Sequence, residues 1–263
     1  MQETHDLDLL IKAAEAAGDI ATGFFKGKNQ VWDKPEGAGP VTEADLAVDN
    51  MLRETLAAAR PDYGWLSEET DDDPSRLDKD KVFIVDPIDG TRSFVAGSST
   101  WAHSLAIAER GKVTAAVVFL PVRGKLYAAS KGGGSTLNGT RIRPDWSAPA
   151  KGATVLAARP IMDEKHWPGG VPDIDRQYRP SLAYRLCLVA EGRFNAMLTL
   201  HKSWEWDIAA GELILAEAGA AVTDQVGETL KFNNPHPQTN GVIASGHGLH
   251  ADFLKRLGAG QGR

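Results

Sequence analysis

The sequence predicts an α+β protein with an antiparallel first half and an α/β second half. Three observations predict this class. Two helical patterns fall within residues 7–60, strand-like runs separated by glycines follow, and strands alternate with helices beyond about residue 145. We therefore expect an N-terminal α+β domain at 1–145 that carries a metal-binding motif, and a C-terminal α/β domain at 146–263 that completes the active-site cleft.

Two helices are predicted before the first long strand. Apolar residues recur at helical spacing over residues 7–25. A second helix begins near Thr42, where Thr-Glu-Ala-Asp resembles a capping box, and ends near Arg60, before Pro61. Asp45 stands where the apolar stripe of this helix would continue. Either this first turn is solvated or Asp45 points into a polar cleft.

The central feature is a buried strand followed by a tight turn. Val-Phe-Ile-Val at 82–85 is apolar and rich in β-branched residues, which indicates a strand buried on both faces. Pro87 is expected to end this strand. Gly90 permits a positive φ, and Thr91 is expected to cap a helix whose amides face a ligand.

Two carboxylates, Asp86 and Asp89, come directly after the strand. Because their charges repel each other, the pair is costly to bury unless a cation matches it. Two carboxylates with carbonyl oxygens nearby suit a hard divalent cation such as Mg²⁺. The alternative is an ordinary Asp-Gly turn with both acids in water.

The remaining expected elements fill out the two halves. A short strand at 63–67 ends in Glu68 and Glu69, and the glycines at 132–134 are expected to form a hairpin turn because no phosphate-loop lysine follows them. The other strands of the first half form an antiparallel meander at 104–108, 113–119 and 126–129. The second half is expected to contain 153–158, a helix at 163–167, 177–179, 181–191, 194–198, a helix at 206–218, 221–223, 241–245 and a helix at 249–257.

Composition narrows the classes of function. The formal net charge of −6 and pI near 5.7 argue against binding of a nucleic-acid polymer, which needs a basic surface. The single cysteine, Cys187, excludes an intramolecular disulfide and is expected to be a small buried hydrophobe. The acidic start and the lack of an apolar run of roughly 18 residues predict a cytoplasmic protein without a membrane partner.

Acidic residues collect at the ends of the predicted elements. Asp207 lies in the first turn of the 206–218 helix, just after Trp204 and Trp206, where it is either a helix cap or a ligand. Oxygen ligands without a cluster of His or Cys indicate Mg²⁺ or Mn²⁺ and not zinc. The acids considered as ligands are Asp45, Glu68, Asp86, Asp89 and Asp207.

Three motifs resemble the signatures of the inositol monophosphatase superfamily. They are Leu-Ser-Glu-Glu at 66–69, Asp-Pro-Ile-Asp-Gly-Thr at 86–91, and Trp-Asp-Ile-Ala-Ala-Gly at 206–211 with Glu-Ala-Gly at 217–219. The resemblance implies a layered αβαβα sandwich, in which an antiparallel N-terminal sheet carries two helices and a mixed C-terminal sheet is covered by helices. It also implies a Mg²⁺-dependent, lithium-sensitive phosphomonoesterase that is commonly a homodimer.

Carried over residue by residue, the resemblance assigns metal ligands. Glu68, Asp86 and the Ile88 carbonyl would hold the first Mg²⁺, and Asp86, Asp89 and Asp207 the second. Glu68 would hold a weaker third ion through water, which places it among the catalytic residues.

The same resemblance assigns catalytic and substrate contacts. Thr91 with Asp45 would orient and deprotonate the attacking water, and the Gly90 and Thr91 amides would bind phosphate. Lys34 matches a family lysine near the metals, with a solvated loop lysine as the alternative.

The substrate is expected to be a small phosphorylated metabolite. Inositol phosphatases carry a glutamate shortly before the last aspartate, but residues 197–203 contain no acid. Arg92, Arg185 and the 227–233 segment look more like the branch that removes the 3′-phosphate of adenosine 3′,5′-bisphosphate, where Arg185 or Lys202 would meet the second phosphate.

Other functions stay open on the sequence. Within the superfamily these are inositol-1-monophosphatase and a broad sugar-phosphate or histidinol-phosphate phosphatase. From other classes they are a glycosidase, which also uses paired carboxylates but no metal, and a non-catalytic metal-stabilised binding module.

Overall fold

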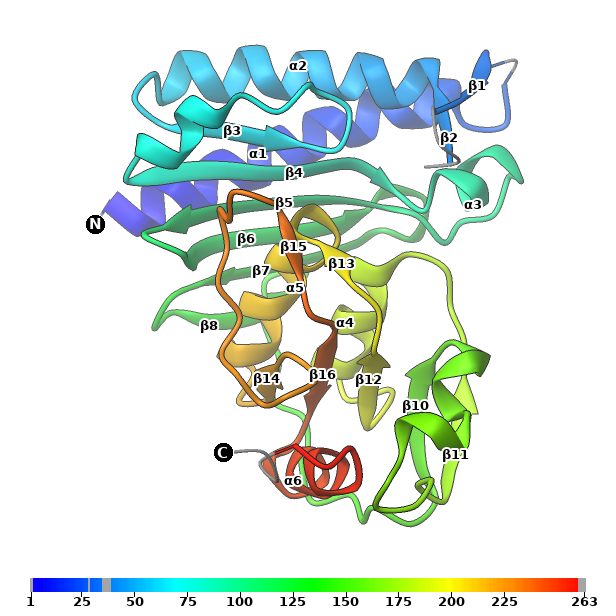
Figure 1. The fold of residues 1–263 in the computed structure, drawn as a ribbon. Helices are drawn as coiled ribbons and strands as arrows, with labels where there is room; N and C mark the ends of the chain where they lie inside the picture. Colours follow the sequence, from blue (N-terminus) through cyan, green and yellow to red (C-terminus); the bar gives the residue numbers. More distant parts are fainter. Residues whose placement is uncertain (1, 28, 35–38, 260–263) are drawn as a thin grey trace.

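The computed structural model describes residues 2–27, 29–34 and 39–259, and its elements stack in five layers (Figure 1). The first layer consists of α1 (Gln2–Phe24) and α2 (Glu43–Ala59), preceded by the small hairpin of β1 (Val31–Asp33) and β2 (Pro40–Thr42). The predicted capping box is present, since Thr42 Oγ1 accepts from the Asp45 amide and the Asp45 carboxylate accepts from the Thr42 amide.

The second layer is a seven-stranded sheet in the order β3-β4-β5-β6-β7-β8-β9. Only the β3–β4 pair is parallel, so the predicted meander is confirmed. The strands are β3 (Gly64–Ser67), β4 (Lys81–Asp89), β5 (Ala102–Glu109), β6 (Lys112–Leu120), β7 (Lys125–Ser130), β8 (Gly134–Leu137) and β9 (Thr140–Arg141). The glycines at 132–134 make the β7–β8 turn, as expected.

Both faces of this sheet are buried, as the apolar run at 82–85 predicts. Phe83 and Val85 pack into the core beneath α1 and α2, whereas Val82 and Ile84 belong to the core on the opposite face. Alternate side chains of one strand therefore join two separate cores.

The end of β4 differs from the expectation. Strand pairing with β5 continues through Pro87 to Asp89, with a bulge between Asp86 and Asp89. The short helix α3 (Thr91–Val95) is capped by Gly90 at φ +99°, and Thr91 is its first residue and not its cap. A left-handed residue makes this sharp turn, which only glycine adopts without strain.

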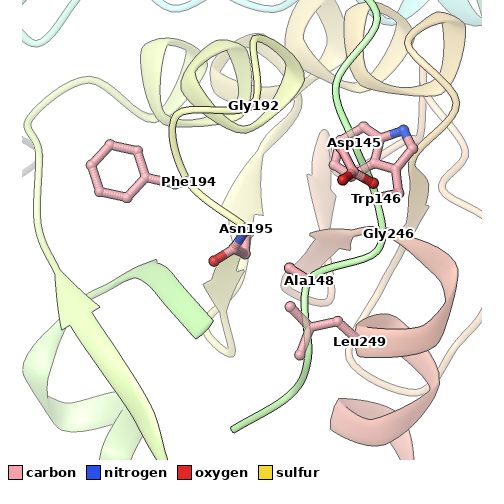
Figure 2. Close-up of a pocket in the computed structure, with 8 residues that line it drawn as sticks. All are labelled: Asp145, Trp146, Ala148, Gly192, Phe194, Asn195, Gly246 and Leu249. Carbon is pink, nitrogen blue, oxygen red and sulfur yellow. The ribbon is translucent and has the colours of Figure 1, made fainter. Parts of the chain in front are cut away.

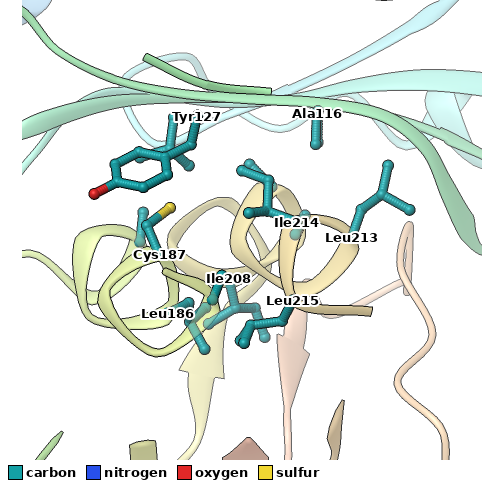
Figure 3. Packing of buried hydrophobic residues seen from close by; sticks show 14 of the residues in the cluster. Ala116, Tyr127, Leu186, Cys187, Ile208, Leu213, Ile214 and Leu215 are labelled. Carbon is teal, nitrogen blue, oxygen red and sulfur yellow. The ribbon is translucent and has the colours of Figure 1, made fainter. Parts of the chain in front are cut away.

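The middle layer consists of α4 (Leu182–Ala190) and α5 (Glu205–Glu217), which lie between the two sheets. Figure 3 shows Cys187 of α4 and Ile214 of α5 on the side of the helices that faces the seven-stranded sheet, whereas Leu186 and Ile208 lie farther from it. The expectation that Cys187 is a buried hydrophobe is confirmed, since its side chain is inaccessible. The residues of α5 are apolar around most of its circumference, as expected for a helix that is covered on both sides.

The fourth layer is a mixed five-stranded sheet in the order β11-β10-β12-β16-β14, and α6 (His247–Arg256) covers its far side through Leu249 and Phe253. Its strands are β10 (Ala153–Ala157), β11 (Ile174–Gln177), β12 (Ala196–Thr199), β14 (Ala221–Thr223) and β16 (Val242–Ser245), and β13 (Ser203–Trp204) pairs separately with β15 (Gln238–Thr239). The helix expected at 163–167 is a single 3₁₀ turn, Glu164–His166, because Pro168 and two glycines follow. The predicted αβαβα layering is confirmed, and the division at 145/146 stays a prediction.

A buried arginine joins the two halves of the chain. The guanidinium of Arg76 is 1% exposed and donates to Asp72 at 2.6 and 2.9 Å, to Asn233 Oδ1 at 2.5 Å and to the Asn234 carbonyl at 3.0 Å. Glu205 at the start of α5 in turn accepts from the amides of Asn233 and Asn234 at 2.6 and 2.9 Å. We call these five residues the Arg76 clasp.

None of the helices in the described ranges combines the length and the apolar character that a membrane crossing requires.

Candidate active site

Three carboxylates meet where β4 ends and α5 begins. Asp86, Asp89 and Asp207 each place one oxygen within 4.8 Å of the others. Burial raises the pKa of Asp86, and repulsion from Glu68, Asp89 and Asp207 raises it further. Burial likewise raises the pKa of Asp207, with added repulsion from Asp89 and Glu68. Negative oxygens concentrated in this way fit a hard divalent cation, which would remove the repulsion.

The N-terminus of α4 holds Asp89 in place. Its Oδ2 accepts from Ser181 Oγ and from the Ala183 amide, both at 2.7 Å. These bonds lower the pKa of Asp89 and oppose the larger upward effect of burial. Ser181 Oγ also caps α4 by accepting from the Tyr184 amide at 3.1 Å, so one hydroxyl both starts the helix and orients the carboxylate.

The bulge between Asp86 and Asp89 is fixed by three side-chain hydrogen bonds. Asp86 Oδ1 accepts from the Ile88 amide at 2.9 Å, and the Ile88 carbonyl accepts from Thr91 Oγ1 at 3.2 Å. The Pro87 carbonyl lies 2.5 Å from His103 Nδ1. Since a carbonyl only accepts, Nδ1 carries the proton.

His103 is a residue that sequence reasoning missed. Its side chain is fully buried, and burial lowers its pKa to about 4, so the ring is neutral at physiological pH. His103 faces the bulge in β4, where the Pro87 carbonyl lies outside the regular pairing with β5. The available signal was a histidine one position before the predicted strand at 104–108, opposite the acidic end of the preceding strand.

Thr91 connects the bulge to Asp45. Thr91 Oγ1 lies 3.3 Å from Asp45 Oδ1, while Asp45 Oδ2 accepts from the Thr42 amide at 2.8 Å and from Thr42 Oγ1 at 2.5 Å. Asp45 is 1% exposed, so its side chain points into a polar interior, while Glu43 in the same turn of α2 is exposed. Burial raises the pKa of Asp45 from 3.8 to about 6, although the Thr42 hydrogen bonds lower it.

Lys34 pairs with both acids that follow β3. Its Nζ lies 2.7 Å from Glu68 Oε1 and 2.8 Å from Glu69 Oε1. Burial raises the pKa of Glu69 to about 7, while the Lys34 hydrogen bond lowers it. Lys34 is therefore an ion-paired residue and not a solvated loop lysine. Glu68 lies outside the cluster formed by Asp86, Asp89 and Asp207.

These residues surround an open cleft of about 350 Å³, a size suited to a small metabolite. We call it the acidic cleft. Arg92 reaches its wall, whereas the Arg185 guanidinium lies over the Tyr178 ring and Lys202 borders a separate depression. The residues lining the acidic cleft are Gly39, Pro40, Glu68, Asp89, Gly90, Thr91, Arg92, Ser93, Tyr178, Pro180, Ser181 and Asp207.

A second pocket lies between Trp146, Asn195 and Gly246, and Asp145 is the one acid in its lining (Figure 2). It holds about 10 Å³, room for about one water molecule. The Asn195 side-chain oxygen already accepts from the Thr154 amide and hydroxyl at 2.8 and 3.0 Å. This pocket is a packing defect and not a substrate site.

Comparison with known proteins agrees with this geometry. The sequence matches a profile described as the inositol monophosphatase family over residues 3–259. It is 34% identical over 237 residues to an inositol-1-monophosphatase of Rhizobium meliloti (strain 1021), covering 84% of this chain and 86% of that protein. It is 29% identical to a histidinol-phosphatase of Chlorobaculum parvum, covering 98% of each chain. The fold matches that of Thermotoga maritima IMPase with a TM-score of 0.80 at 27% identity, covering 97% of each chain.

Proposed function

Because the chain belongs to the inositol monophosphatase family and is a phosphatase that cleaves phosphoric monoesters, we propose that it is a Mg²⁺-dependent 3′(2′),5′-bisphosphate nucleotidase. It would convert adenosine 3′,5′-bisphosphate to AMP. The observation that carries the metal-dependent chemistry is the set of Asp86, Asp89 and Asp207 oxygens within 4.8 Å of one another, at the edge of the acidic cleft.

The donor set fits Mg²⁺, with Mn²⁺ as a substitute. All the candidate ligands are oxygens: the carboxylates of Glu68, Asp86, Asp89 and Asp207, and the Ile88 carbonyl. Two or three Mg²⁺ ions held by these groups would lower the pKa of the attacking water and neutralise charge on the phosphate. The raised pKa values of Asp86 and Asp207 support this assignment, because burial and repulsion from neighbouring carboxylates outweigh the attraction of nearby groups, and a cation would reverse that balance.

The chain supplies the proton acceptor through Thr91 and Asp45. Asp45 Oδ2 is occupied by Thr42, so Oδ1 is the oxygen free to accept the Thr91 hydroxyl proton. A carboxylate with a pKa near 6 is mostly ionised at neutral pH and is still basic enough to take a proton from a hydroxyl hydrogen-bonded to water. Thr91 would orient the water, and Asp45 would receive its proton.

Phosphate would bind at the turn formed by Gly90 and Thr91. Gly90 packs so tightly that a Cβ there would lie 3.2 Å from the Thr100 carbonyl oxygen. This turn therefore brings backbone amides to the cleft wall without a side chain between them and the ligand. Arg92 adds positive charge to the wall of the same cleft, and Lys34 pairs with the lining residue Glu68 and so reduces the negative charge there; both favour an anionic substrate.

The choice of substrate within the family rests on a missing acid. Residues 197–203, before Asp207, contain no acid, and the nearby Glu205 is buried and accepts from the Asn233 and Asn234 amides, so no carboxylate is available there for polyol hydroxyls. This supports a substrate with a second anionic group over inositol 1-phosphate. The relatives' names make inositol 1-phosphate and histidinol phosphate the competing candidates. We further propose a homodimer that lithium inhibits and that acts in the cytoplasm.

A parallel assay tests this function. We expect Mg²⁺-dependent phosphate release from adenosine 3′,5′-bisphosphate, with a higher kcat/KM than for inositol 1-phosphate, fructose bisphosphate or histidinol phosphate, and none in EDTA. Release that survives EDTA would refute the metal-dependent mechanism. A higher kcat/KM for inositol 1-phosphate would refute the nucleotidase assignment while keeping the metal chemistry.

A further inference from the structure

One exposed aromatic ring stands in the acidic cleft. Tyr178 is 51% exposed and lines the cleft together with Gly90, Thr91 and Asp207. Two other strongly exposed aromatic side chains of the described ranges, Trp32 and Trp204, do not line it. Exposing a large aromatic face to water is unfavourable in free energy, and a ligand that covers the ring would remove this unfavourable contribution.

The ring is held from one side by a stacked arginine. The guanidinium carbon of Arg185 lies 4.5 Å from the Tyr178 ring centroid. Arg185 Nε donates to the Arg179 carbonyl. The Arg179 guanidinium in turn donates to the Tyr178 carbonyl at 2.6 Å and lies over the Phe194 ring, 5.5 Å from its centroid. Guanidinium stacking of this kind fixes the orientation of an aromatic ring.

The stacked pair lies beside the reacting end of the cleft. The positive charge of Arg185 opposes the upward shift of the pKa of both Asp89 and Asp207, so the guanidinium is within electrostatic reach of the carboxylates. Ser181, three residues after Tyr178, donates to Asp89 Oδ2. The ring is therefore anchored on the same α4 entry segment that orients a candidate metal ligand.

We propose that Tyr178, backed by Arg185, is the specificity-determining platform on which the heteroaromatic base of a nucleotide substrate stacks. The inference rests on the proposed phosphatase function and narrows its substrate class to phosphomonoesters with a planar aromatic group. Stacking recognises any base, because every base has a π face, and a guanidinium behind the ring adds charge without taking up the open face. Polyol phosphates gain much less from such a surface.

Hydrolysis by ring variants tests the platform. Tyr178→Phe keeps the aromatic face and Tyr178→Ala removes it; the tyrosine hydroxyl makes no hydrogen bond within the described ranges, so the Phe variant is a matched control. We expect Tyr178→Ala to lower kcat/KM for adenosine 3′,5′-bisphosphate roughly 5- to 150-fold, the value of one base stack. For β-glycerophosphate, which has no ring, both variants should stay within about 2-fold of the parent. Equal losses on both substrates, or no loss on either, would overturn the proposal.

Binding without turnover separates this proposal from the proposed function. Calorimetry of the Mg²⁺-loaded protein compares AMP, the product of the proposed reaction, with ribose 5-phosphate, which lacks the base. We expect the parent and Tyr178→Phe to prefer AMP, and Tyr178→Ala to lose most of that preference. An enzyme that hydrolyses no phosphomonoester but shows this pattern would refute the function and support the platform. A preference for AMP that is the same in Tyr178→Ala as in the parent would refute the platform whatever the enzyme hydrolyses.

Discussion

Replacing Asp45 with asparagine should stabilise the metal-free protein while it inactivates the enzyme. The side chain is buried, and its pKa is raised from 3.8 to about 6. Asparagine has nearly the same shape, and its oxygen can accept from Thr42 as the carboxylate does. Its amide would instead donate to Thr91 Oγ1, which leaves the hydroxyl proton directed at the Ile88 carbonyl. The substitution thus removes a buried charge and keeps the capping box.

The size of the stabilisation follows from the pKa shift. The folded state raises the pKa of Asp45 by roughly two units, and each unit corresponds to about 1.36 kcal/mol, so the ionised carboxylate destabilises the fold by about 3 kcal/mol above pH 6. The sign is that of a raised carboxyl pKa: the folded state binds the proton more tightly, and stability falls as pH rises from about 4 to about 6. Asp45→Asn should remove this loss at pH 8 and change little near pH 4.

Thermal unfolding in EDTA at pH 4.5 and pH 8 measures the effect. A gain of about 3 kcal/mol at pH 8 corresponds to a rise in Tm of roughly 6–12 °C for a chain of this size. Without its proton acceptor, the same variant should lose about 100- to 10,000-fold in kcat with Mg²⁺ present. A variant no more stable than the parent at pH 8 would show that Asp45 is not an unfavourably buried carboxylate, and the argument for its basicity would fail with it.

Substitutions at three further positions test the site. Asp86→Asn should weaken Mg²⁺ binding, measured by calorimetry, by about 100-fold or more. Loss of a residue that only supports a metal ligand weakens metal binding by about 10- to 100-fold, and loss of a direct ligand should cost at least as much. Unchanged affinity would remove Asp86 from the ligand set. Gly90→Ala should lower the free energy of unfolding by about 1–2 kcal/mol and reduce kcat, because a Cβ at φ +99° is strained and meets the Thr100 carbonyl oxygen at 3.2 Å; a fully active, equally stable variant would contradict this. His103→Leu, which leaves the Pro87 carbonyl without a donor, should weaken Mg²⁺ binding about 10- to 100-fold, and His103→Asn, which keeps an N–H donor, should lose less. A loss of stability without a change in Mg²⁺ affinity would make His103 a packing residue only.

Local patterns were enough to predict most of the elements. The apolar run at 82–85 predicts a strand buried on both faces because four consecutive apolar residues cannot all be covered from one side. The capping box at Thr42 is equally local, since its partners are three residues apart. Local rules were less successful at turns: the predicted end of β4 at Pro87 was wrong because pairing with β5 continues across the bulge.

Contacts between distant residues were beyond sequence reasoning. The Asp89–Ser181 hydrogen bond joins residues 92 positions apart, and His103 reaches Pro87 across the sheet, so no spacing rule connects either pair. A strand was expected at 177–179, but the strand in this region is Ile174–Gln177, which pairs in parallel with β10. That shift leaves Tyr178 outside the sheet and in the acidic cleft.

The Arg76 clasp limits how substrate can reach the carboxylates of the acidic cleft. A swing of the two halves about a hinge would break the hydrogen bonds of the buried Arg76 guanidinium to Asn233 and Asn234, while its pair with Asp72 in the same half stays. A hydrogen bond to a charged group is worth about 1.5–3 kcal/mol, so this motion is costly. Glu205, which accepts from Asn233 and Asn234, lies two residues before Asp207 in the second half, so the same motion would carry the Asp207 carboxylate away from Asp86 and Asp89. Metabolites must therefore come and go through the cleft's permanent opening, past the Tyr178 ring, and not by jaw-like motion of the whole protein.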